Sequence, residues 1–200
     1  MPASLPNPAA PAQDETRSVL AIPAFRKLWN SMVFSSLGDW LGLLATTALA
    51  AQLSGGSYAT ANFAIAGVFI VRLLPAVILG PFAGVIADRF DRRKLMIVFD
   101  ILRFSLYLSI PIVGNYFWLY TATILVECVS LFWSPAKDAS VPNLVPKEKL
   151  ESANQVSLFA AYGTAPIAAG LFAILALLSS AIASAFPSFK GTSVDIALYI

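Results

Sequence analysis

Histidine is absent from this 200-residue chain, and cysteine occurs once, at Cys128. Clustered His and Cys side chains make protein zinc sites, and paired cysteines make disulfides, so the sequence predicts neither a metal site nor a disulfide framework. Charged residues make up 12% of the chain, about half of their usual share in a soluble domain. Because so few charges cannot cover a water-facing surface, most of the chain is expected to face lipid.

Signatures of nucleic-acid binding, ATP use and catalysis are also missing. The net charge of +2 is too small to indicate a nucleic-acid partner. No Gly-x-x-x-x-Gly-Lys-Ser/Thr loop occurs, so ATP is not expected to drive a step within this chain. A His-Glu-x-x-His signature, a paired-aspartate motif and a Gly-x-Ser-x-Gly elbow are missing too, which argues against an intramembrane enzyme. The sequence therefore predicts a protein that is not an enzyme and holds no cofactor.

Long apolar runs dominate the chain, and 58% of its residues are hydrophobic. A helix that crosses the hydrocarbon core needs about 20 mostly apolar residues. The runs lack the two-residue alternation of membrane barrels, so they predict an all-α membrane protein. The first residues are rich in Pro and Ala without a secretory-signal pattern, and residues 1–27 predict a cytoplasmic tail. The expected transmembrane bundle, residues 28–200, has spans at 28–51, 59–86, 95–113, 116–133 and 156–183, and a sixth span that begins at 194.

The basic residues of the loops predict the orientation of the bundle. Short loops rich in Lys and Arg stay in the cytoplasm. Basic residues lie before the first span, in the loop between the second and third spans, and in the loop between the fourth and fifth. The other loops have almost no basic residues. The sequence therefore predicts an integral membrane protein with a cytoplasmic N-terminus. The residues concerned are Arg17, Arg26, Lys27, Arg89, Arg92, Arg93, Lys94, Lys137, Lys147 and Lys149.

Two motifs carry a family resemblance. Between the second and third spans, Gly84, Asp88, Arg89, Arg92 and Arg93 follow the spacing Gly-x-x-x-Asp-Arg-x-x-Arg-Arg. After the fourth span the chain reads Pro-Ala-Lys-Asp-Ala-Ser-Val-Pro-Asn-Leu-Val-Pro, followed by Leu-Glu-Ser-Ala-Asn. Both patterns resemble the major facilitator superfamily of solute transporters, in particular the macrolide-efflux and enterobactin-exporter branch, which is similar to the drug:proton antiporters.

The resemblance implies a fold, a location and a set of partners. Members of the superfamily have two six-helix halves, with the substrate near the midplane between them. This chain would be the N-terminal six-helix bundle, truncated at the start of helix 6, in a bacterial plasma (inner) membrane. Its partners would be the lipid bilayer, protons, a small-molecule substrate and the missing C-terminal half. Asp88 and Arg89 would latch the two halves in the outward-facing state; alternatively, the basic residues only hold the loop inside.

Two charged residues lie in the middle of expected spans, Asp39 in the first and Arg72 in the second. Ionisable residues inside a membrane are costly and therefore indicate a functional site. Adjacent antiparallel helices would let the two form an ion pair, which lowers the cost of burying either one. The pair is either a structural contact that fixes helix register, or a coupling site where Asp39 exchanges Arg72 for a proton or a cationic substrate. A carboxylate in a low dielectric holds a proton more readily than in water, as coupling requires.

A second group of intramembrane charges is expected closer to the cytoplasm. Asp100 and Arg103 are three residues apart and share one helix face. At 1.5 Å per residue, Arg103 lies ~13 Å from the cytoplasmic end of the third span and Glu127 ~10 Å from that of the fourth. The three residues predict a charge cluster near the inner leaflet. The resemblance implies that such a cluster joins a cytoplasmic network with the loop after the second span.

Small residues and prolines predict close helix packing in two segments. Gly80 and Pro81 lie near the end of the second span, and Gly163, Pro166 and Gly170 lie in the fifth. Small side chains let helices approach closely, and proline removes a backbone donor and bends a helix. The fifth-span segment resembles the Gly-x-x-x-Gly-Pro-x-x-Gly-Gly motif of drug antiporters, with alanine at several of the glycine positions.

These features predict a secondary active transporter that exports an amphipathic small molecule, coupled to protons, by alternating access. One alternative is a lipid or lysophospholipid flippase of the same fold. Another is a non-transporting, truncated membrane remnant, since the expected bundle is under half of a transporter. If an uncoupler abolishes export, the result favours the proton-coupled exporter over the flippase. The encoded sequence beyond Ile200 tests whether the protein is a truncated remnant.

Overall fold

The computed structural model describes residues 19–87 and 90–185, and the long elements in these ranges are all α-helices. Within them, five segments are long and apolar enough to cross a membrane: Pro23–Leu53, Tyr58–Pro81, Arg92–Val113, Tyr116–Leu144 and Lys147–Ser179. The predicted all-α membrane architecture is confirmed, while the sixth span expected from residue 194 lies outside the described residues. In chain order the elements are α2 (Pro23–Leu53), α3 (Tyr58–Ala87), α4 (Arg92–Val113), α5 (Tyr116–Asp138), α6 (Val141–Leu144), the 3-10 helix η1 (Lys147–Lys149), α7 (Leu150–Tyr162) and α8 (Ala165–Ala185).

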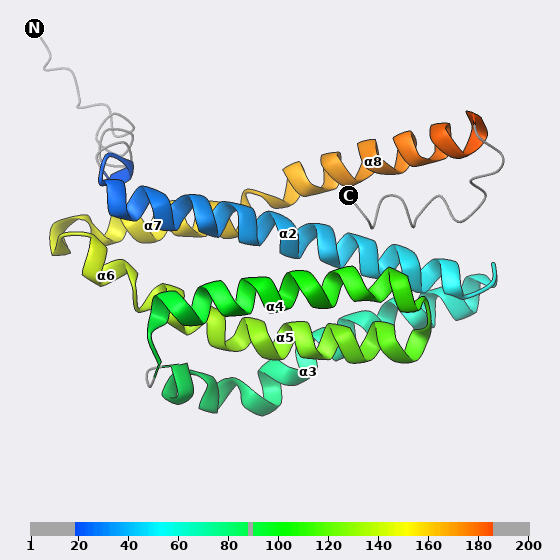
Figure 1. The fold of residues 1–200 in the computed structure, drawn as a ribbon, viewed down its shortest axis with the longest axis horizontal. Helices are drawn as coiled ribbons and strands as arrows, with labels where there is room; N and C mark the ends of the chain where they lie inside the picture. The colour runs from blue at the N-terminus through cyan, green and yellow to red at the C-terminus, as the bar shows by residue number, and fades with distance from the viewer. Residues whose placement is uncertain (1–18, 88–89, 186–200) are drawn as a thin grey trace, which may run out of the picture.

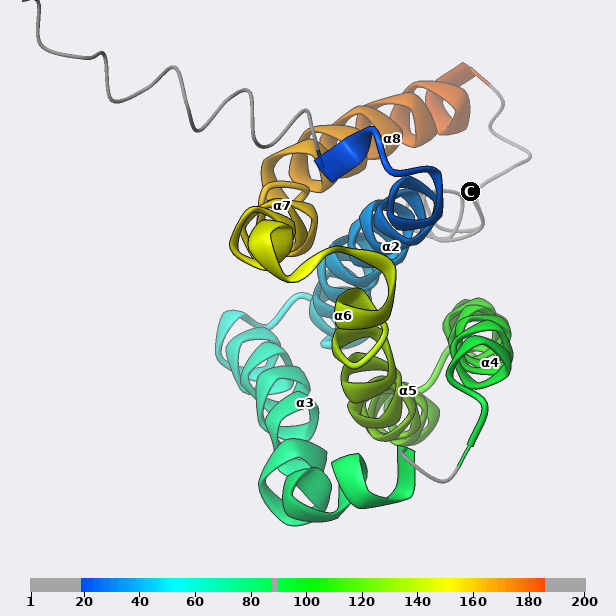
Figure 2. The ribbon, with the colours of Figure 1, turned by 90° about the vertical axis from the view of Figure 1, so that its left-hand side faces the viewer.

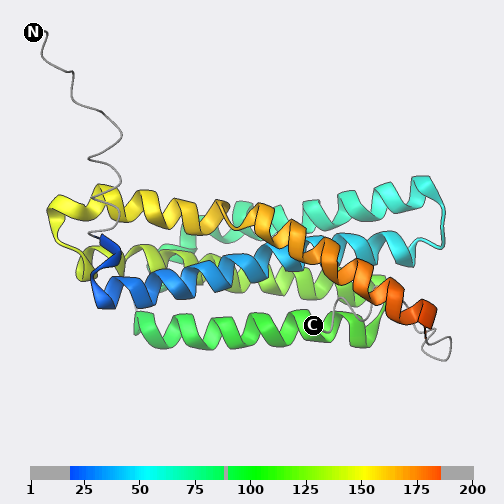
Figure 3. The same ribbon diagram turned by 90° about the horizontal axis from the view of Figure 1, so that it is seen from above.

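The long helices lie side by side along one axis, and α8 continues in the direction of α7 (Figures 1 and 3). α5 packs between α3 and α4, and α2 contacts α3, α7 and α8. The view along the bundle shows α4 and α8 apart from each other (Figure 2). The beginnings of α2 and α4 and the α6–α7 segment lie at one end of the bundle, so the basic loops named above share that end.

Local signals explain where the helices begin and end. α2 begins with Pro23, whose fixed φ suits the first helical turn and whose missing N–H is not needed there. Asp91 caps the beginning of α4 by accepting a hydrogen bond from Lys94 N at 2.9 Å, and Gly114, with φ 59°, caps its end. Asn115 then caps α5 by accepting from Trp118 N at 2.8 Å. A left-handed glycine followed by an N-capping asparagine thus reverses the chain within two residues.

Two clusters of buried side chains hold the two ends of the bundle. At the end with the basic loops, Phe25 and Met32 of α2 pack against Trp133 of α5 and Val156 of α7. Toward the other end, α2, α3, α4 and α5 meet around Leu49, Val68, Ile110 and Leu119. The middle of the bundle, between these apolar clusters, is where the charged side chains lie.

The expected fifth span is longer than predicted and is interrupted. α7 begins at Leu150 rather than 156 and ends at Tyr162, and α8 begins at Ala165. The interruption lies just before Pro166, which has no N–H to donate to the carbonyl of Tyr162. At the same place, Trp40 of α2 donates through Nε1 to the neighbouring carbonyl of Ala161 at 2.9 Å.

The fourth helix also extends beyond its predicted end. α5 continues through Pro135 to Asp138, whereas the expected span ended at residue 133. A proline removes one backbone hydrogen bond, which a transmembrane helix tolerates where neighbouring groups compensate. The charged residues Lys137 and Asp138 therefore lie on the last turn of α5 rather than in a loop.

Candidate functional site: the intramembrane charges

Two ion-pair groups lie inside the bundle, and their pairing differs from the expected one. Arg103 of α4 forms ion pairs with Asp39 of α2 and with Asp100 on its own helix. Arg72 of α3 pairs with Glu127 of α5, with 2.8 Å between Nη2 and Oε1. The predicted contact of Asp39 with Arg72 is therefore wrong, and Glu127 pairs with Arg72 rather than with Arg103. The reason is that α3 packs mainly against α5, which places Glu127 opposite Arg72.

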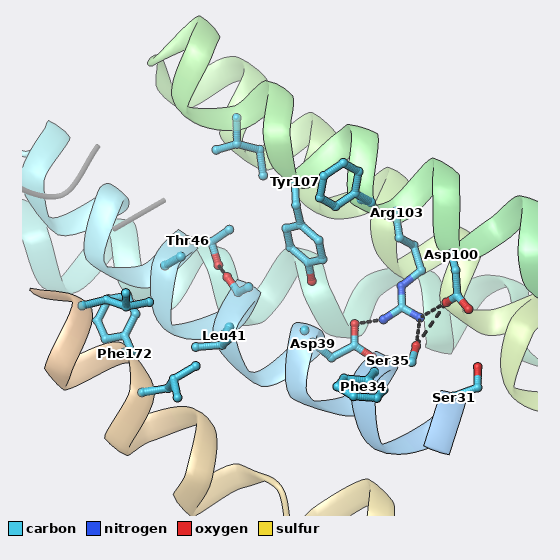
Figure 4. A pocket seen from close by; sticks show the side chains of 17 residues that line it. Ser31, Phe34, Ser35, Asp39, Leu41, Thr46, Asp100, Arg103, Tyr107 and Phe172 are labelled. Atoms are coloured by element: carbon cyan, nitrogen blue, oxygen red, sulfur yellow. Dashed lines mark hydrogen bonds and ion pairs between the residues drawn. The ribbon is translucent and has the colours of Figure 1, made fainter. Parts of the chain in front are cut away.

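The Arg103 group is the more connected of the two. Arg103 is 5% exposed, and its Nη1 donates to Ser35 Oγ at 3.1 Å and lies 3.6 Å from Asp100 Oδ1. Ser35 in turn donates to Asp100 Oδ1 at 3.1 Å. Figure 4 shows Arg103 reaching from α4 toward Ser35 and Asp39 on α2. The guanidinium also lies 5.8 Å from the centre of the Trp133 ring, so α2, α4 and α5 all meet around this one cation.

Sequence reasoning missed Ser35, Trp133 and Tyr107 as members of this region. Ser35 lies four residues before Asp39, on the same face of α2, and this spacing could have identified it. Tyr107 lies four residues after Arg103 on α4 by the same rule. No comparable signal marks Trp133, because its place beside Arg103 depends on how α5 packs.

A cavity of about 640 Å³ opens beside the Arg103 group, between α2, α4 and α8. Asp39, Asp100 and Arg103 form part of its wall, while Phe34, Phe104 and Phe172 are among its apolar residues (Figure 4). Tyr107 crosses this space and lies against Gly42 of α2, where a Cβ would lie 2.5 Å from the ring. Glycine at this position is therefore what lets the Tyr107 ring approach α2.

A second cavity of about 260 Å³ shares the lining residues Asp39 and Arg103 with the first. Residues of α2, α3, α4, α5 and α7 line it, and both Asp39 and Arg72 are among them. The two residues that were expected to pair thus face one cavity without forming an ion pair. The lining residues are Met32, Ser36, Asp39, Trp40, Leu43, Arg72, Arg103, Ser130, Trp133, Ser134, Lys137, Ala161 and Tyr162.

The described residues contain no group of three or more Cys, Asp or Glu side chains that could hold a metal ion. Asp39 and Asp100 instead share an arginine. Two carboxylates beside one buried cation leave one negative charge that a proton can neutralise. The arrangement is therefore suited to binding and releasing a proton.

The charged loop motif is described only in part. Asp88 and Arg89 lie outside the described residues, and Gly84 lies in the last turns of α3. Arg92 donates through Nη1 to the carbonyl of Ala139 at 2.7 Å, which joins the beginning of α4 to the end of α5. Arg93 is exposed. The gating role of this loop stays a prediction.

The residues expected to pack helices closely have few near neighbours in the described part of the chain. A Cβ at Gly80 or Gly170 would meet nothing within 4 Å, whereas one at Gly163 would clash with Phe159 of its own helix. Pro81 is exposed at the side of α3, and Pro166 lies in the first turn of α8. The close contacts between helices occur at Gly42 and at Gly67, where the Tyr107 and Tyr120 rings pack.

Comparison with known proteins agrees with the sequence motifs. A family model described as transmembrane secretion effector matches residues 15–198. An uncharacterized MFS-type transporter of Bacillus subtilis, YfiS, is 36% identical over 135 residues, which are 65% of this chain and 30% of that protein. Macrolide efflux protein A of Enterococcus faecalis is 33% identical over 86 residues, or 40% of this chain and 27% of that protein. The putative bacilysin exporter BacE of Bacillus subtilis is 30% identical over 151 residues, or 74% of this chain and 36% of that protein.

The chain spans about a third of the length of these curated relatives. No solved structure matches it significantly. The relatives are named as transporters and exporters, which are not enzymes, so the predicted family resemblance and the exclusion of an enzyme are confirmed. The chain belongs to the transmembrane secretion effector family, a branch of the MFS-type transporters that includes macrolide-efflux proteins.

Proposed function

We propose that this helical bundle works as one part of a secondary transporter that exports an amphipathic small molecule in exchange for protons. Family membership supports transport, and relatives named for macrolide efflux and bacilysin export support the outward direction. Transporters of this superfamily alternate access between two helical bundles around a central site. The second bundle is the partner that the proposal requires, and a bacterial inner membrane with the N-terminus in the cytoplasm is the proposed setting.

The observation that carries the proposal is the sharing of Arg103 by two carboxylates. Near the middle of the described spans, Asp39, Asp100 and Glu127 face only Arg72 and Arg103. One negative charge therefore remains without a full partner in a low dielectric, where it costs free energy. Uptake of a proton by Asp39 removes that cost and leaves Arg103 with Asp100. Release of the proton restores the ion pair with α2, so proton binding changes how strongly α2 and α4 are held together.

Asp39 is the proposed coupling residue because it lines both cavities and lies on a different helix from Arg103. Asp100 sits one turn from Arg103 on the same helix and meets α2 only through the neutral hydroxyl of Ser35, so its protonation would remove no ion pair between helices. Asp88 and Arg89 are proposed to latch the bundle to its partner in the outward-facing state. Replacing either one is expected to slow the transport cycle more than substrate binding.

Efflux measured with the complete gene product tests the proposal. Cells that produce the protein should accumulate less of a radiolabelled macrolide than cells without it, and a protonophore should abolish the difference. Asp39→Asn should insert normally but export no more than cells without the protein. Lys147→Gln, on the exposed 3-10 helix η1 before α7, is the matched control and should export normally.

Each outcome assigns the function differently. Export by Asp39→Asn equal to that of the unchanged protein would remove Asp39 from coupling. Export that persists with the protonophore would contradict proton coupling. Absence of macrolide export together with movement of a labelled lysophospholipid between leaflets would replace the proposal by a lipid flippase, and absence of both would indicate a protein that does not transport.

A further inference from the structure

The smaller cavity, of about 260 Å³, has a chemical character of its own. Four residues of α5 line it at spacings of three, one and three residues, so they lie on one face of the helix: Ser130, Trp133, Ser134 and Lys137. Arg72 of α3 lies near the middle of the bundle, whereas Lys137 lies on the last turn of α5. The cavity thus follows α5 from a buried arginine to a lysine near the basic loops.

Hydrogen-bond donors outnumber acceptors in this cavity. Arg72 Nη1 and Arg103 Nε are buried, and no described group accepts a hydrogen bond from either. Glu127 binds Arg72 through the other nitrogen, Nη2, so Nη1 is without a carboxylate partner. Among the lining residues the single carboxylate is Asp39, which is already in contact with Arg103. A buried donor without a partner is costly, so the cavity is suited to a ligand that brings acceptors.

Cations also outnumber carboxylates along the wall. Arg72, Arg103 and Lys137 line the cavity against Asp39. Each of the three cations already contacts a carboxylate, namely Asp39 and Asp100 for Arg103, Glu127 for Arg72 and Asp138 for Lys137, so what the wall offers a ligand is unused donors. Lys137 Nζ lies 2.8 Å from Asp138, which is largely exposed to water, and 6.0 Å from the Trp133 ring. Hydroxyl groups of Ser130 and Ser134 lie between Arg72 and Lys137 along α5, and hydroxyls donate readily to anions.

We propose that this cavity binds the acidic group, a carboxylate or a phosphate, of the molecule that the protein exports. Arg72 Nη1 donates to the anion, Lys137 attracts it from the end with the basic loops, and Trp40 and Tyr162 contact its apolar part. Tyr162 is 67% exposed, so its ring is available to a ligand. That the ligand is exported rests on the proposed function, whereas its binding does not.

The physical basis is the strength of charged hydrogen bonds away from water. Bonds between an arginine and an anion are roughly twice as strong as neutral ones. Because Glu127, Asp39 and Asp138 already balance the three cations, the preference for an anion is expected to come from the unused donors and not from a net positive charge.

Calorimetry with the purified chain in lipid nanodiscs tests the proposal. Phenylphosphate and phenyltrimethylammonium have the same ring with opposite charges, so they form a matched pair of probes. Phenylphosphate should bind saturably above the signal of empty nanodiscs, and phenyltrimethylammonium should not. Equal or stronger binding of the cation would overturn the proposal.

Two variants locate the binding. The double variant Arg72→Gln with Glu127→Gln removes one positive and one negative charge together, so it leaves no unpaired buried ion. It should weaken phenylphosphate binding about tenfold or more, the loss expected for a charged hydrogen bond. Ser134→Ala should weaken binding by a smaller factor of about three, as expected for a neutral hydrogen bond. Lys147→Gln should bind as the unchanged protein does. Unchanged affinity in the double variant would overturn the assignment to this cavity.

Lipid head groups carry phosphate too, and a change of lipid separates the two sources. Phenylphosphate affinity should be the same in nanodiscs of phosphatidylcholine and in nanodiscs that contain phosphatidylglycerol. Competition by phosphatidylglycerol would identify a head group as the occupant and would overturn the proposal of an exported acid. Anion binding without proton-driven export would contradict the proposed function alone, and export without anion binding would contradict this inference alone.

Discussion

Arg72 and Arg103 are both largely buried, but different numbers of carboxylates face them. Arg103 contacts Asp39 and Asp100 and also donates to Ser35. Arg72 has Glu127 as its ion-pair partner, and both side chains are about a fifth exposed, at 18% and 19%. Loss of one carboxylate therefore has a different consequence at each arginine. This difference separates the structural part of the charge network from the part that is free to change its protonation.

Glu127→Gln is expected to destabilise the protein more than Asp39→Asn. Breaking a buried ion pair by removing one partner costs on the order of 3 kcal/mol, because the remaining ion stays buried without compensation. Asp39→Asn leaves Arg103 with Asp100 and Ser35, so a loss of about 1 kcal/mol is expected. Unfolding of the two variants in detergent, followed by tryptophan fluorescence, measures the difference. The double variant Arg72→Gln with Glu127→Gln should recover part of the loss, and equal destabilisation by both single variants would contradict the assignment.

The identity of the intramembrane charges was predictable from the sequence, but their partners were not. A charged residue inside an apolar run is visible in the sequence, and its distance from the loops predicts its depth. Depth does not say which neighbouring helix a side chain faces. Asp39 and Arg72 were expected to pair because both lie in the middle of spans that are adjacent in the sequence. Their actual partners follow from the packing of α3 against α5 and from the reach of Arg103 toward α2. These contacts depend on tertiary structure that no local pattern carries.

At the scale of the elements, the interruption between α7 and α8 is held by α2. Two tryptophans of α2 donate to carbonyls of α7: Trp29 to Val156 at 3.0 Å and Trp40 to Ala161 at 2.9 Å. The carbonyl of Val156 lies inside α7, where the helix itself supplies a donor. The carbonyl of Ala161 lies in the last turn, where the helical hydrogen bonds are ending. The two indole hydrogen bonds thus have similar lengths, but the bond to Ala161 is expected to contribute more to stability.

Trp40→Phe is expected to loosen this interruption, and Trp29→Phe is its matched control. Removal of the Trp40 indole N–H leaves the carbonyl of Ala161 without a donor and should cost about 1–2 kcal/mol. Trp29→Phe should cost less, because Val156 keeps its helical hydrogen bond. Hydrogen exchange of the amides at the beginning of α8 measures the effect, and faster exchange is expected for Trp40→Phe alone. Equal rates in both variants would show that the indole of Trp40 does not hold the interruption.

At the scale of the whole molecule, apolar length predicted the helices well and their interruptions less well. The first four expected spans lie within α2, α3, α4 and α5, because about 20 apolar residues have few stable alternatives to a transmembrane helix. The extension of α5 through Pro135 and the early beginning of α7 were not predicted. Both segments adjoin the apolar cluster around Phe25 and Trp133, which includes Ala153 of α7, and this tertiary packing is not visible in the sequence.

The orientation of the bundle is the last prediction, and it combines the loops with the fold. The structure gathers the beginnings of α2 and α4 and the segment before α7 at one end of the bundle, and these are the segments rich in Lys and Arg (Figure 1). Positively charged segments stay in the cytoplasm, so this end is expected to face inward. In a Cys128→Ser background, Ser57→Cys should react in intact cells with a membrane-impermeant maleimide, and Arg93→Cys should react only after permeabilisation. Both positions are exposed, so access to the reagent depends on the side of the membrane. Labelling of Arg93→Cys in intact cells would show the opposite orientation. Lys137 would then receive an anion from the outside of the cell and not from the cytoplasm.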